Sequence, residues 1–283
     1  DPLDVAIEAY SKTRELDDDG KLDDKVKEGL ISVKALLKRK GVNDYYSERY
    51  DGALESFEKV LLINELDLFA GEFDTVMVQY SGIISREIAS KTDDKELYKK
   101  TIKYYKQLAA AGFGGPNTYL QMKMDYLQIG DTLGALEILK EAYNMYPDTV
   151  NVIANVADIY IQLKQLDEGL EFMNSVIEKN PEIPESHYWK GRILINMETL
   201  ESVDEAIESY KKAGEMGPDI YYVWYDLGYI YYLQGADFFD RSNEETDDAM
   251  RTALIEAGNE KYQESIPILE KAYEQNTQNR DVQ

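Results

Sequence analysis

Few side chains in this sequence could carry out covalent chemistry. The 283 residues contain no cysteine and one histidine, His187, so thiolate nucleophiles, thiolate metal sites and disulfides are excluded. A single histidine needs a nucleophile and an orienting acid before it can act as a catalytic base. His187 falls instead at a packing position of the repeat described below, where we expect it in the core. The sequence therefore predicts a protein that is not an enzyme.

Two short segments imitate ligand-binding loops. GFGGPN, at residues 112–117, lacks the lysine and the serine or threonine of a phosphate-binding loop, and no predicted strand precedes it. We interpret it as a helix stop followed by a proline start. ELDDDGKLDDKV, at residues 15–26, spaces its acids as a calcium loop does, but its twelfth position is Val26 rather than a bidentate glutamate. We therefore expect a solvated turn there, and no metal ion or cofactor.

The charge of the chain excludes other classes of partner. There are 55 acidic residues against 31 basic ones, which gives a formal net charge of -24 and a pI near 4.4. Such a surface repels phosphate backbones and anionic lipid headgroups. The sequence also has no apolar run approaching the roughly 18 residues that a membrane span needs. We expect no nucleic acid partner and no membrane span.

A period of 34 residues organises the chain. In YYVWYDLGYIYYLQG, at residues 221–235, one tryptophan, a Leu-Gly pair and one tyrosine follow the spacing W-x2-L-G-x2-Y. Residues 135–147 and 206–218 carry the complementary pattern of alanine, a large apolar or aromatic residue, alanine and proline. Pro147 and Pro181 are 34 residues apart. With these motifs, the sequence resembles the tetratricopeptide repeat (TPR) family over nearly its whole length.

The resemblance implies an all-α fold, a right-handed superhelical TPR solenoid of antiparallel helix pairs. We predict a single array over residues 1–283 whose last pair is elongated, with Pro267 inside its second helix. The predicted parts are a half repeat at 1–18 and full repeats at about 27–65, 74–115, 116–149, 150–183, 184–220 and 221–277.

The resemblance also implies where a ligand would bind. In similar proteins the second, fifth, ninth and twelfth residues of each repeat face a concave groove, distinct from the packing positions that Trp224, Leu227, Gly228 and Tyr231 occupy here. The predicted ligand-binding residues are Tyr222, Tyr225, Tyr229, Tyr232, Tyr188, Arg192, Asn151 and Asp158. The lysine and asparagine pair with which some relatives hold a terminal carboxylate is missing, since Lys38 is followed by Val42.

These features favour a non-enzymatic protein-protein interaction or scaffolding module that binds a peptide or protein segment, neutral or basic, in a tyrosine-rich groove. The alternative is a glycan-binding protein that uses the tyrosines as a stacking platform. The sequence also resembles exported bacterial TPR proteins, which favours the periplasm over the cytoplasm. Because the array opens on an unpaired second helix, we expect either a further helix upstream or self-association through uncapped ends.

Overall fold

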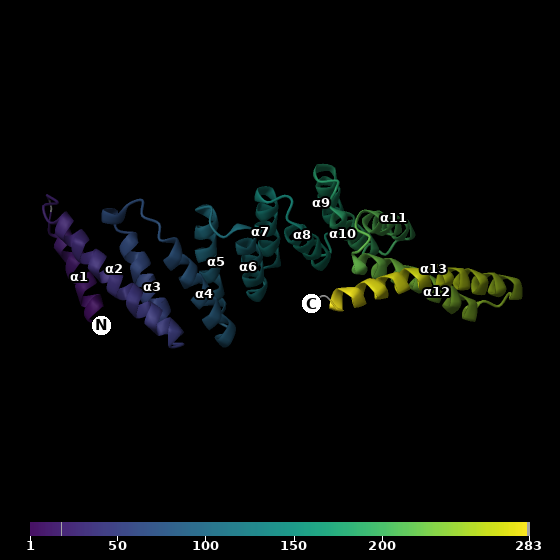
Figure 1. Cartoon of the computed structure of the whole chain (residues 1–283), viewed down its shortest axis with the longest axis horizontal. Helices are drawn as coiled ribbons and strands as arrows, with labels where there is room; N and C mark the ends of the chain where they lie inside the picture. Colours follow the sequence, from purple (N-terminus) through teal and green to yellow (C-terminus); the bar gives the residue numbers. More distant parts are fainter. Residues whose placement is uncertain (18, 282–283) are drawn as a thin grey trace. The chain divides into compact units, whose positions relative to one another are not determined.

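The computed structural model describes residues 1–17 and 19–281, and this part of the chain is helical throughout, without a strand (Figure 1). The predicted all-α class is confirmed. The helices are α1 (Pro2–Glu15), α2 (Asp23–Tyr46), α3 (Tyr50–Asn64), the short 3-10 helix η1 (Asp67–Phe69), α4 (Thr75–Thr92), α5 (Lys95–Ala110), α6 (Gly115–Gln128), α7 (Thr132–Met145), α8 (Val150–Gln162), α9 (Leu166–Lys179), α10 (Pro184–Ile195), α11 (Leu200–Met216), α12 (Tyr221–Glu244) and α13 (Asp248–Asp281).

The backbone repeats with the same period as the sequence. After α1, the helices follow one another as pairs joined by tight turns. Three successive turns hold a residue in the left-handed region of backbone space, namely Gly130 (φ 83°), Lys164 (φ 56°) and Glu198 (φ 58°). These positions are 34 residues apart, so the same turn recurs once per pair. The repeated helix pairs that the sequence predicts are therefore present.

Side chains fix the start of several helices. Asp74 accepts a hydrogen bond from the Met77 backbone nitrogen at 3.1 Å, and Asp94 accepts one from the Glu96 nitrogen at 2.9 Å. Such caps satisfy donors that have no partner within the helix. The segment at residues 112–117 begins α6 with a proline in its first turn, after α5 has ended at Ala110, so the predicted helix stop and proline start are confirmed.

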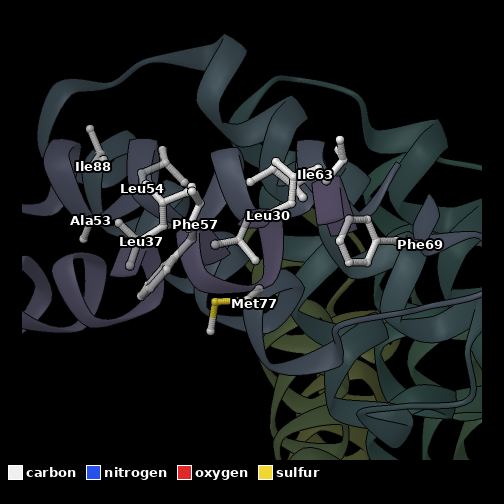
Figure 2. Close-up of a cluster of buried hydrophobic side chains, with 13 residues drawn as sticks. Leu30, Leu37, Ala53, Leu54, Phe57, Ile63, Phe69, Met77 and Ile88 are labelled. Carbon is white, nitrogen blue, oxygen red and sulfur yellow. The ribbon is translucent and has the colours of Figure 1, made fainter. Parts of the chain in front are cut away.

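The chain divides into two compact units, Asp1–Leu139 (unit 1) and Lys140–Gln283 (unit 2). Unit 1 has a core of apolar side chains between α2, α3 and α4 (Figure 2). Leu30, Phe57 and Val60 in this core are fully buried. Burying one such side chain stabilises a fold by about 1.5–3 kcal/mol relative to leaving it exposed.

A buried ion pair also joins α4 to α6 within unit 1. Arg86 donates to both carboxylate oxygens of Asp125, from Nε at 2.8 Å and from Nη2 at 2.6 Å. Only 1% of Asp125 is exposed. Burial raises the pKa of Asp125 above its ordinary value, against the opposing effect of the Arg86 guanidinium.

Unit 2 has its own core between α10, α11 and α12. Helix α8 packs on α10 as well as on α9, so the first helices of successive pairs lie next to each other. Tyr210 is the largest fully buried side chain of this core, and its ring lies in the space that Gly191 leaves open on α10. A glycine at that position lets the neighbouring helix approach closely.

The last pair is elongated, as predicted: α12 has 24 residues and α13 has 34, with Pro267 inside it. The two helices lie side by side (Figure 1). Ser265 on α13 donates to the Gly228 carbonyl at 2.9 Å, and further along the pair Gly235 faces Gly258. Gly228 and Gly235 are seven residues apart on one face of α12, so two small residues hold the helix backbones close together.

This close approach leads to a stability prediction for Gly235→Ala. Alanine is the better helix former by about 1 kcal/mol. However, a Cβ atom at this position would lie 2.7 Å from Tyr262 Cδ1 and 3.1 Å from the Gly258 carbonyl oxygen. Because the backbone cannot move aside, we expect the variant to lose about 1–3 kcal/mol of unfolding free energy, measured by urea denaturation.

The control is Asp237→Ala, an exposed change two residues further along α12, which should alter stability by about 0.5 kcal/mol or less. A Gly235→Ala protein as stable as the wild type would contradict the close packing of α12 on α13.

Candidate functional site

Three of the predicted ligand-binding tyrosines share one exposed face of α12. Tyr225 is 53% exposed, and Tyr229 and Tyr232 are each 45% exposed. Their spacing of four and three residues places them on the same side of the helix. The opposite side, with Val223 and Leu227, is buried in the core of unit 2. The core thus holds the helix in place while the tyrosines face outward.

The exposed tyrosines belong to a continuous row of stacked rings that spans α12 and α13. Tyr225 stacks on Tyr229 with centroids 6.1 Å apart, and Tyr229 stacks on Tyr232 at 6.2 Å. Tyr262 of α13 continues the row at 5.4 Å from Tyr232, and Phe239 follows at 5.4 Å from Tyr262. The planes of consecutive rings differ by 5° to 29°. We call these five residues the ring row.

Sequence reasoning did not include Tyr262 and Phe239 in the site. Phe239 lies seven residues after Tyr232, so the same helical spacing, carried further along α12, would have found it. Tyr262 comes from the other helix, and its place in the row depends on the alignment of α12 with α13. No local pattern in the sequence gives that alignment.

Tyr222 and Tyr188 lie deeper than the sequence analysis assumed. Tyr188 on α10 is buried in the core of unit 2, and Tyr222 on α12 is half-buried against the same core. Their rings meet edge to face with centroids 4.8 Å apart. These two tyrosines therefore anchor α12 to α10, next to the exposed part of the site.

A small polar network accompanies this anchor. The Tyr188 hydroxyl donates to Asp226 Oδ2 at 3.0 Å and accepts from Arg192 Nη1 at 3.0 Å. Burial raises the pKa of Tyr188 to about 12 and also raises the pKa of Asp226. The tyrosine is therefore neutral at physiological pH, and Arg192 is oriented by the side chains around it.

Asn151 and Asp158 lie on α8, and their hydrogen bonds stay within that helix. Asp158 accepts from Gln162 Nε2 at 2.6 Å, and the Asn151 carbonyl accepts from Asn155 Nδ2 at 2.6 Å. The structure thus brings Tyr188, Arg192 and Tyr222 into one cluster, with the ring row on the same α12. Its contacts do not extend this cluster to Asn151 and Asp158 among the described residues.

Two of the expected packing residues are less buried than predicted. Leu227 and Tyr231 are buried, as expected, but Trp224 is half-buried, and the Lys271 ammonium lies 3.4 Å from its ring centre. His187 is also half-buried rather than in the core. Burial together with the charges of Lys212 and Lys190 lowers the pKa of His187. Both residues occur at the same repeat position, near solvent, where their polar nitrogens need no partner in the core.

The acidic turn before α2 is held by its own chain. Asp17 accepts a hydrogen bond from the Leu22 backbone nitrogen at 2.6 Å, and Asp19 forms an ion pair with Lys21. Asp18 lies outside the described residues. Within residues 1–17 and 19–281, no group of three histidine, aspartate or glutamate side chains is placed to hold a metal ion, and no helix is long and apolar enough to cross a membrane.

Comparison with known proteins identifies the repeat. Residues 126–193 match the family model described as tetratricopeptide repeat, and these residues form the middle pairs of helices. The chain is a tetratricopeptide repeat protein. This TPR protein is 22% identical over 162 residues to the TPR repeat-containing protein YpiA of Bacillus subtilis (strain 168), with 53% of the chain covered and only 38% of that relative's length.

Solved structures of TPR proteins give partial matches. A TPR repeats protein from Bacteroides fragilis NCTC 9343 matches with a TM-score of 0.46 at 16% identity, covering 88% of this chain and 94% of the other. YrrB, described as a TPR protein with an unusual peptide-binding site, matches with a TM-score of 0.42 at 18% identity, covering 78% and 98%. TPR proteins are in general interaction modules rather than enzymes, and this chain is a scaffold of that class.

Proposed function

We propose that this TPR protein binds a segment of another protein on the ring row of its last helix pair. The observation that carries this proposal is the exposure of Tyr225, Tyr229 and Tyr232 on one face of a well-packed helix. Tyrosines displayed in this way dominate many interfaces, because each ring offers a large apolar area and a hydroxyl for hydrogen bonding.

The stacking within the row supports this role energetically. Side chains that become ordered on binding each cost about 0.5–1.5 kcal/mol. Here each exposed tyrosine already rests on a neighbouring ring, as Tyr229 does between Tyr225 and Tyr232. Such a surface is partly ordered before a partner arrives, so less of the interaction energy is lost on binding.

The same stacking favours a protein segment over a glycan. A sugar packs on the face of an aromatic ring, but both faces of Tyr229 and Tyr232 are directed toward neighbouring rings. The ring edges and hydroxyls are then what the row presents to a partner. A polypeptide offers apolar side chains for the edges and carbonyl groups for the hydroxyls. Screening the protein against soluble glycans and against peptide libraries separates the two candidates.

The partner segment is neutral or basic in this proposal. The chain carries a formal net charge of -24, which repels acidic partners and accelerates the approach of basic ones. Association should therefore slow as the salt concentration rises, since screening shortens the range of this attraction to about 8 Å at physiological ionic strength.

Alanine substitutions at Tyr225 and Tyr229 test the site. We expect each to weaken partner binding by more than about 1 kcal/mol, on the scale of aromatic hot spots. The melting temperature should barely change, because both rings are about half exposed. The measurement is affinity capture from the source cell with wild-type and variant baits, followed by titration of the captured partner.

Leu233→Ala provides the matched control, because Leu233 is an exposed apolar residue of α12 outside the ring row. Its binding should equal that of the wild type. If Tyr225→Ala and Tyr229→Ala retain full binding, or if they destabilise the fold as a buried tyrosine would, the ring row is not the binding site.

A further inference from the structure

A groove of about 490 Å³ opens in unit 1, apart from the ring row of unit 2. It is lined by α3, by the segment that leads into α4 and by α5. Its apolar part includes Leu62 and Phe73, which are 59% and 45% exposed. Large apolar side chains that stay exposed and converge on a groove are typical of an interaction surface.

The lining also contains a polar atom without a partner. The side-chain oxygen of Asn64, Oδ1, is buried and accepts no hydrogen bond within the described part of the chain. Buried acceptors in native proteins are nearly always satisfied. An occupant of the groove that carries an N–H donor would satisfy this one.

The charges around the groove indicate the sign of the occupant. Five carboxylates and three ammonium groups line it, from Glu55, Glu58, Glu65, Glu72, Asp74, Lys59, Lys100 and Lys103. Two of the lysines are already paired, Lys59 with Glu55 at 2.6 Å and Lys100 with Glu58 at 2.5 Å. The excess of acids matches the acidic character of the whole chain and favours a cation.

We propose that this groove binds a basic amphipathic segment of another protein. Its apolar side chains pack on Leu62 and Phe73, its lysine or arginine side chains lie among the carboxylates, and one of its N–H groups reaches Asn64. This site goes beyond the function proposed above, because it lies in the other unit and uses none of the ring row. A scaffold with both surfaces could hold two segments at once.

The probe is a short amidated peptide with leucines on one helical face and arginines on the other. A second peptide has glutamates in place of the arginines. Affinities are measured by calorimetric titration at near-physiological salt, with light scattering to record the oligomeric state. We expect the arginine peptide to bind the full chain at least about tenfold more tightly than the glutamate peptide.

The double variant Leu62→Ser/Phe73→Ser removes the apolar part of the groove. We expect it to weaken binding of the arginine peptide at least about tenfold, as for the loss of two interface anchors. Ile31→Ser is the matched control, because Ile31 is exposed, apolar and outside the groove lining. It should bind as the wild type does. Because all three side chains are exposed, the melting temperatures should stay unchanged.

Several results would overturn the proposal. The arginine peptide could fail to bind, or it could bind Leu62→Ser/Phe73→Ser as tightly as the wild type, which would indicate unspecific attraction to an acidic surface. A wild-type dimer that the double variant dissociates would assign the groove to a second copy of the chain. Tyr225→Ala/Tyr229→Ala should bind this peptide normally, so failure of the ring row and failure of the groove are distinguishable.

Discussion

Replacing Arg86 with methionine is expected to lower the free energy of unfolding by about 3–5 kcal/mol, the range for removing one partner of a buried ion pair. The reason is that Asp125, only 1% exposed, would keep its carboxylate in the interior without the guanidinium that donates to both of its oxygens. Methionine fills most of the volume of the lost side chain, so the change tests the charge more than the packing. Chemical denaturation at pH 7 measures the effect.

The pH dependence of the Arg86→Met variant distinguishes this explanation from a packing defect. Burial already raises the pKa of Asp125 above its ordinary 3.8, and removing Arg86 raises it further. A carboxyl group with a raised folded-state pKa stabilises the fold while protonated, and that stability is lost as the pH rises through the folded-state pKa. The variant should therefore be closest to the wild type near pH 4 and lose stability toward pH 7.

Arg86→Met/Asp125→Asn provides the control for this prediction. A neutral amide costs far less to bury than an uncompensated carboxylate. The double variant should recover part of the lost stability, and its difference from the wild type should no longer grow over that pH range. An Arg86→Met protein with an equal loss at pH 4 and pH 7 would indicate that packing, and not the charge of Asp125, causes the effect.

A second large effect is expected from Tyr210→Ala in unit 2. Tyr210 is 1% exposed, and its ring fills the space beside Gly191, with the Tyr188 ring centre 5.6 Å away. Removing a fully buried aromatic ring leaves a cavity and should cost about 3–5 kcal/mol. Calorimetric melting of the whole chain records the loss.

The matched comparison for Tyr210→Ala is the same change at Tyr225, on the neighbouring helix. Tyr225 is 53% exposed, so its substitution should alter stability by about 0.5 kcal/mol or less. One chemical change thus gives a large loss at a packing position and almost none at the proposed binding position. Equal losses at both positions would contradict the division of tyrosines into core and surface residues.

The repeat explains why so much of this fold could be predicted from the sequence. Small residues and large apolar residues recur at fixed spacing because two short helices bury their apolar faces only against each other and their neighbours. Gly191 and Tyr210 follow this pattern, and the long last pair with Pro267 follows from the extra residues between the two parts of the final repeat. The pattern does not show how deeply each position is buried, which is why Trp224 and His187 were wrongly expected in the core.

The site was predictable where it depends on a single helix. Tyr225, Tyr229 and Tyr232 share a face because of helical spacing, which can be read from the chain. The ring row as a whole depends on Tyr262, which reaches it only because the small residues Gly235 and Gly258 bring α12 and α13 together. Contacts between helices decide such details, as they do for Tyr188, which the groove pattern placed on the surface and the structure places in the core.

The most direct test of the central claim places a photoreactive group in the ring row. Tyr229→p-benzoylphenylalanine keeps an aromatic ring at the middle of the exposed tyrosines, and Leu200→p-benzoylphenylalanine places the same group at an exposed position outside the row. After irradiation of source cells that express each full-length variant, covalent adducts are identified by mass spectrometry. The proposal predicts a discrete protein adduct at position 229 that is absent at position 200. No polypeptide adduct at position 229, or the same adducts at both positions, would contradict it.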